Sequence, residues 1–235
     1  MWPLIPLHLH GDQGFGMLGS SFMEVAKLVH AQDRSERQFY SEVATAYLFR
    51  HAIELFLKSL IVILELRNAP KRTVSSIRLD VSGRPVPLAR THNLEALYQR
   101  LCTLAKLGGE RLSLQTLCDW GAALVEVQED MGYLHRLDGS GTSLRYPSPI
   151  LAKGGESKSL FYEMDPSEID QLLQAGSASG KFEKLVVVED QHGNVQSTYR
   201  MRPDFFAIEL EVIERAASTF QTLHTCARAT ITDPY

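Results

Sequence analysis

The sequence predicts a mainly α-helical fold: an up-and-down bundle of four to five long helices with a small β-hairpin insertion. Apolar residues recur at helical spacing over several long stretches without proline, and capping sequences precede several of them. A run rich in β-branched residues lies near the C-terminal end of the chain. With 235 residues, 44% of them hydrophobic, the chain can bury one large core. We therefore treat residues 1–235 as a single helical domain, with residues 148–203 as an insertion that carries a short helix and the hairpin.

Two helices are expected in the N-terminal third of the chain. The serine pair at residues 20–21 can cap a short helix that ends near Gln32, and the glycine-rich GFGMLG before it is interpreted as a loop. SERQ at residues 35–38 is a capping box, in which the serine and glutamine side chains satisfy backbone N–H groups. It opens a long helix over residues 36–66, which contains neither glycine nor proline.

The middle of the chain predicts a turn region and two more helices. Residues 73–90 alternate in polarity around a Ser-Gly pair, which favours a small hairpin or an irregular loop. Asn93 can cap the next helix, and the glycine pair at residues 108–109 is expected to end it. A further helix over residues 113–137 is expected to be interrupted softly at its two glycines. The stretch DGSGTSLRYPSP that follows is predicted to be a loop.

The C-terminal third combines a short helix, a hairpin and a final long helix. Asp165, with proline next and glutamate three residues on, is a second capping signature, and AGSASG is expected to end that helix. Residues 184–201 form two β-rich arms around QHGN, which predicts a hairpin. The last helix is expected over residues 204–228, with a broad apolar face.

The composition excludes several classes of function. The net charge of −4 argues against nucleic-acid binding driven by overall charge, although a local basic site remains possible. The longest apolar run is far shorter than the roughly 20 residues that a membrane span needs. We therefore expect a cytoplasmic protein with no metal, no cofactor and no membrane partner. The wide spacing of the cysteines favours three reduced thiols, Cys102, Cys118 and Cys226.

The most apolar helix carries a stripe of charges. Because a helix turns about 100° per residue, five polar side chains fall within one sector of about 100°, and almost all other positions of residues 46–66 are apolar. Two interpretations stay open: the stripe is the solvated face of a central helix, or it is a covered polar seam, in which charges must be paired. The five residues are Arg50, His51, Glu54, Lys58 and Glu65.

Three short motifs resemble the HEPN superfamily (higher eukaryotes and prokaryotes nucleotide-binding). They are LFRHAIELFLKSLI, THNLEALY and DGSGTSLRYP, and they occur here in the order typical of many bacterial members. The resemblance covers residues 20–147 and implies a four- or five-helix up-and-down bundle, often dimeric. It also implies a shared polar cluster that includes the stripe. Its members here would be Arg50, His51, Glu54, Lys58, His92, Asp138, Arg145 and Tyr146.

The resemblance implies two alternative functions. Many family members are metal-independent ribonucleases with a histidine four to six residues after an arginine, and no Arg–His pair of this chain has that spacing. We therefore expect a non-nucleolytic binding or scaffolding protein, within a bacterial defence or toxin–antitoxin system, with a second copy or another protein as its partner. RNA or a nucleotide is a further possible ligand. The alternative is a divergent ribonuclease that uses Arg145 and His135.

The polar cluster itself allows two chemistries. Arg145 and Lys58 can hold phosphate, one by its planar fork and the other as a point charge. Asp138 and Glu54 can instead neutralise the cations in a structural network. An open cleft around the cations would favour binding or cleavage, whereas burial and internal pairing would favour architecture.

Overall fold

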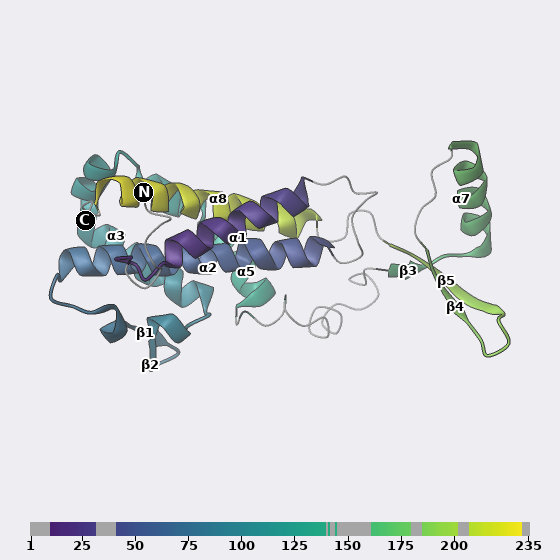
Figure 1. Cartoon of the computed structure of the whole chain (residues 1–235), viewed down its shortest axis with the longest axis horizontal. Coiled ribbons are helices and arrows are strands. Elements are labelled where there is room, and N and C mark those ends of the chain that lie inside the picture. The colour runs from purple at the N-terminus through teal and green to yellow at the C-terminus, as the bar shows by residue number, and fades with distance from the viewer. Residues whose placement is uncertain are drawn as a thin grey trace.

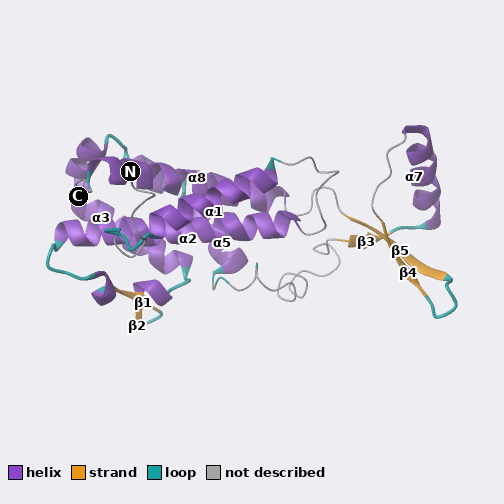
Figure 2. Ribbon diagram, in the orientation of Figure 1, coloured by secondary structure: helices purple, strands orange, loops and turns teal. Residues whose placement is uncertain are grey.

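The computed structural model describes residues 10–31, 41–139, 141, 144, 161–179, 185–201 and 207–231. Within them the fold is mainly helical with small antiparallel sheets, which confirms the predicted class (Figures 1 and 2). The helices are α1 (Phe15–His30), α2 (Ser41–Asn68), α3 (Leu94–Thr116), α4 (Trp120–Glu126), α5 (Gln128–Asp138), α7 (Pro166–Ser179) and α8 (Ala207–Thr230). The strands are β1 (Arg78–Val81), β2 (Arg84–Pro87), β3 (Phe161–Glu163), β4 (Leu185–Glu189) and β5 (Val195–Met201). Short 3-10 turns η3 (Val74–Ser76) and η4 (Leu88–Arg90) flank the first hairpin.

Helix α2 is the central element of the helical body formed by α1–α5 and α8. It packs against α1, α3 and α8, and α1 and α8 run beside it in Figure 1. Every residue from Ala52 to Glu65 is buried, including the charged ones. The interpretation of the charge stripe as a solvated face is therefore wrong. The apolar surface of α2 is so wide because neighbours cover it on all sides.

Helix α1 begins earlier than predicted. It starts at Phe15, so most of GFGMLG is helical and is not a loop. Gly14 takes the left-handed conformation (φ 80°) at the N-cap, and the carboxylate of Asp12 accepts hydrogen bonds from the N–H groups of Gly14 (3.0 Å) and Gly16 (2.9 Å). Gly19 faces α2, where a β-carbon would lie 3.1 Å from the ring of Phe56. Gly19 thus allows α1 to approach α2 closely.

Helix α3 begins and breaks at the two predicted places. Asn93 caps α3 by accepting from the N–H of Ala96 at 2.9 Å, as predicted. The first helical segment ends at Gly109 (φ 52°, ψ −149°), as predicted, but a second segment follows directly after this kink and continues α3 to Thr116. The capping box at residues 35–38 lies outside the described residues.

The break before α4 lies at Leu117 and not at Gly121, where it was predicted. The chain leaves the helix at Leu117, which adopts a left-handed conformation (φ 53°), and Asp119 caps α4 through the N–H of Ala122 at 2.9 Å. Gly121 and Gly132 both lie inside helices. An N-capping carboxylate satisfies an orphan N–H, which makes Asp119 a stronger boundary signal than either glycine.

The predicted hairpin near the C-terminal end forms, residues 73–90 adopt the hairpin and not the irregular loop, and one strand was not predicted. β1 pairs with β2, and β4 pairs with β5, both antiparallel. Strand β3 joins the second hairpin to give a sheet with the order β3-β5-β4. Asp165 caps α7 as predicted, accepting from the N–H of Ser167 at 3.0 Å, and α7 ends at Ser179, within the AGSASG stretch that was expected to end it. In Figure 1 this sheet and α7 lie apart from the helical body.

Two cysteines are joined in a disulfide, which overturns the expectation of three reduced thiols. Cys118 in the α3–α4 turn bonds to Cys226 of α8, with 6.6 Å between their α-carbons, while Cys102 remains a free thiol. The two positions are 108 residues apart, so their spacing gave no local indication of the pair. Among the described helices, none combines the length and hydropathy that a membrane crossing requires.

Candidate functional site

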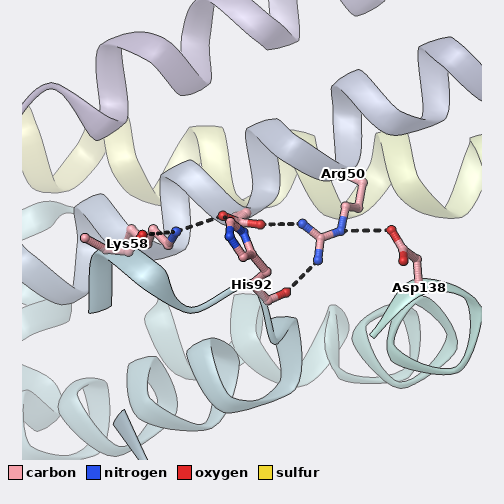
Figure 3. A network of polar contacts seen from close by, with 6 residues as sticks. Arg50, Lys58, His92 and Asp138 are labelled. Carbon is pink, nitrogen blue, oxygen red and sulfur yellow. Dashed lines mark hydrogen bonds and ion pairs between the residues drawn. The ribbon is translucent and has the colours of Figure 1, made fainter. Parts of the chain in front are cut away.

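Arg50 is the centre of a buried polar network. Its guanidinium, on α2, donates to the carboxylate of Glu54 and to the backbone oxygen of His92 at 2.6 Å, and its Nε lies 3.3 Å from Oδ2 of Asp138 (Figure 3). The Arg50 side chain is only 1% exposed. One arginine thus joins α2 to the segment before α3 and to the end of α5.

Glu54 lies between the two cations. Its Oε1 accepts a hydrogen bond from Nζ of Lys58 at 2.8 Å and lies 2.9 Å from Nδ1 of His92, while Oε2 accepts from Arg50. Burial alone would raise the pKa of the Glu54 carboxyl above its ordinary value of 4.5, but the charges of Lys58 and Arg50 outweigh that effect and lower the pKa to about 2. The carboxylate is therefore ionised at neutral pH.

Lys58 completes the network at its other end. Its Nζ also approaches the backbone oxygen of Ala89 at 3.4 Å and lies 5.9 Å from the centre of the Phe15 ring, a cation–π contact with α1. The residue is 2% exposed. A carboxylate, a backbone oxygen and an aromatic ring of the protein itself therefore surround this ammonium group.

Gly141, which follows the end of α5, lies against the Arg50 side chain. Gly141 has φ +74°, a conformation that favours glycine, and a β-carbon there would lie 2.9 Å from a terminal nitrogen of Arg50. Its N–H donates to the backbone oxygen of Asp138 at 3.2 Å. The backbone at Gly141, the last residue of the DGSG motif, therefore lies so close to the Arg50 guanidinium that a larger side chain would not fit.

The charges of this network cancel. Two cations, Arg50 and Lys58, face two carboxylates, Glu54 and Asp138, and all four side chains are at most 3% exposed. His92 is the accessible member, with 44% of its side chain exposed. Of the two alternatives that the sequence left open, the covered and internally paired seam is the one observed.

The other candidate residues lie outside the network. The ring of His51 stacks on Tyr47 and meets Phe22 edge-on, with ring centres 5.9 and 4.5 Å apart. His135 of α5 places Nε2 3.1 Å from the carboxylate of Glu95 on α3. Arg145 and Tyr146 lie outside the described residues, so the structure does not test the alternative pair Arg145 and His135.

A second buried cluster was missed by sequence reasoning. Asp12 accepts a hydrogen bond from Ser59 at 2.5 Å, Arg228 lies 3.3 Å from its Oδ1, and Nε2 of His224 lies 3.9 Å from its Oδ2. Burial would raise the pKa of Asp12, but His224 and Ser59 outweigh it and hold the pKa well below its ordinary value. The available signal was Ser59, a polar residue on the apolar side of α2.

A pocket of about 940 Å³ lies along α3 and α4, away from the network. Tyr98, Cys102 and Trp120 line it together with exposed leucines, and no member of the Arg50 network does. Within the described part of the chain, no group of three histidine, cysteine or carboxylate side chains converges as a metal site would require.

No protein-family model, curated protein or solved structure matches this chain.

Proposed function

We propose that this chain is a non-nucleolytic, HEPN-like helical-bundle protein that works by binding a protein partner, as a scaffold in a bacterial defence or toxin–antitoxin system. The observation that supports this proposal is the internal neutralisation of Arg50 and Lys58 by Glu54 and Asp138 inside the fold. The resemblance of the three sequence motifs supplies the family context and the four- or five-helix arrangement.

Phosphate recognition needs cations that can turn toward a ligand. Arg50 already directs its fork at Glu54, Asp138 and a backbone oxygen, and Lys58 is held by Glu54. Exchanging these partners for a phosphate would leave buried carboxylates without counter-ions, which costs several kcal/mol. The network is therefore poorly suited to RNA binding and well suited to fixing helices relative to one another.

The network joins segments that lie far apart in the sequence. Arg50 and Lys58 on α2 connect to η4 through Ala89, to the start of α3 through His92 and to the end of α5 through Asp138. Hydrogen-bonded polar groups hold such segments in one arrangement, because any other would leave charges unpaired. A fixed helical body is a suitable support for a separate binding surface.

One observation favours the alternative, a divergent ribonuclease. His92 is accessible, and the adjacent carboxylate of Glu54 would orient its ring as a carboxylate orients a general base. In such an enzyme, His92 or the pair Arg145 and His135 would act on RNA.

Labelled RNA tests the two functions. We expect purified protein to leave RNA uncut, and we expect His92→Ala and Arg145→Ala to bind RNA as the wild type does at each of several salt concentrations. Gel shift and cleavage assays, with His135→Ala in parallel, measure both properties. Cleavage that disappears in His92→Ala or Arg145→Ala would establish the ribonuclease instead.

A further inference from the structure

Strand β4 is an edge strand with an open side. In the sheet order β3-β5-β4, strand β5 lies in the centre and β4 pairs with β5 alone. The N–H and C=O groups on its other side have no strand partner in the described part of the chain. Such an edge is a template for another strand.

β4 lacks the features that usually protect an edge. Its sequence is LVVVE, with neither proline nor lysine, and Val186, Val187 and Val188 are 36%, 47% and 42% exposed. Alternate residues of a strand point to opposite faces, so apolar side chains are exposed on both faces of the sheet. The one irregularity is a bulge, which leaves Gln196 of β5 as the extra residue, and it does not interrupt β4.

We infer that β4 pairs antiparallel with β4 of a second copy of this chain, about a two-fold axis at Val187. This inference depends on the proposed function only in that the chain works by binding a protein partner. The pairing would join two three-stranded sheets into one of six strands. An isologous contact of this kind requires a surface complementary to itself.

The sequence of β4 meets that requirement. With Val187 opposite its own copy, Val186 faces Val188 of the partner subunit, and Leu185 faces Glu189 of the partner subunit. No like charges oppose each other, and β-branched pairs stabilise antiparallel strands. If the register were shifted by one residue, Val187 would lie opposite Val188 or Val186 of the partner subunit. No residue would then face its own copy across the two-fold axis.

Charge complementarity extends across the joined sheet. Arg200 of β5 is the register partner of Leu185. The row across the interface therefore contains Arg200, Leu185 and Glu189 of the partner subunit, all on one face. Arg200 and Glu189 of the partner subunit would therefore lie on the same face of the sheet, two strands apart, with opposite charges. The two-fold axis would repeat this pair on the other side of the interface. This arrangement favours a second copy over an unrelated strand.

Sedimentation or light scattering over a range of protein concentrations tests the inference. We expect the wild type to be a dimer, and we expect Val187→Lys and Val187→Glu each to raise the dissociation constant about a hundredfold, because two like charges would meet on the axis. An equimolar mixture of the two variants should recover the dimer. The control is Val125→Lys, at a valine of α4 that is 70% exposed and remote in sequence from β4.

Three results would overturn this interface: a wild type that stays monomeric, a dimer unaffected by either substitution, or a mixture that fails to recover. A wild type that stays monomeric and pairs β4 with a strand of another protein would also overturn it. The RNA assay has separate outcomes. A dimer that cleaves RNA would contradict the proposed function but support the β4 interface. A monomer without ribonuclease activity would contradict the β4 interface but remain consistent with the proposed function.

Discussion

Replacing Glu54 with glutamine is expected to lower the free energy of unfolding by about 3–5 kcal/mol, the range for breaking a buried ion pair by removing one partner. Glutamine keeps the shape of the side chain but removes the charge that Arg50 and Lys58 share. Both cations are almost fully buried, so water cannot replace the carboxylate. Denaturation by urea at neutral pH, followed by circular dichroism, measures the loss.

Glu65→Gln is the matched control on the same helix. Glu65 is nearly as buried as Glu54, but its partners Arg72 and Arg100 have side chains that are 40% and 31% exposed. These arginines can turn into water when the charge is removed, so we expect a smaller loss of about 1–2 kcal/mol. Equal losses in the two variants would show that the Arg50 network contributes no more than an ordinary half-exposed ion pair.

Gly16→Ala is expected to destabilise the protein by about 1–3 kcal/mol, the usual cost of overpacking a core. A β-carbon at this position would lie 2.0 Å from Nε2 of His224 and 2.9 Å from Oδ2 of Asp12. The imidazole cannot move freely, because it is buried beside the ring of Phe56 with ring centres 5.3 Å apart. The substitution would therefore separate α1 from α8.

Gly132→Ala, the same change in another helix, is expected to have the opposite effect on stability. Gly132 lies inside α5, and the nearest atom to a β-carbon there is a nitrogen of Arg136 at 3.6 Å, an ordinary contact. Alanine should stabilise this helix by about 0.5–1 kcal/mol, because glycine loses more backbone entropy on folding. Thermal denaturation of both variants gives the comparison, and a Gly16→Ala protein as stable as Gly132→Ala would contradict the packing described for α1.

Local signals predicted much of the fold. Asn93 and Asp165 were identified as helix caps because a capping side chain bonds a backbone N–H only two or three residues away. The hairpin arms of β4 and β5 were found from their β-branched residues and the turn between them. Each of these features depends on neighbours in the sequence.

The features that were not predicted depend on residues far apart in the chain. The pairing of Arg50 with Glu54 followed from i,i+4 spacing, but its burial did not, because the covering groups come from His92 and the loop at Gly141. The same holds for the disulfide of Cys118 and for Asp12, whose partner Ser59 is 47 positions away. Hydrophobic periodicity shows which face of a helix is covered but not which segment covers it.

Acid titration of stability tests most directly whether the buried charges maintain the fold. The pKa of Glu54 is depressed in the folded protein, so its contribution is fully present above about pH 4.5 and is lost as the pH falls toward 2. The measurement is the free energy of unfolding of the wild type and of Glu54→Gln from pH 7 to pH 3. We predict a gap of several kcal/mol at pH 7 that narrows steadily below about pH 4.5, because protonation makes the wild type resemble the variant. A gap that is absent at pH 7, or that stays constant down to pH 3, would contradict this account of the network.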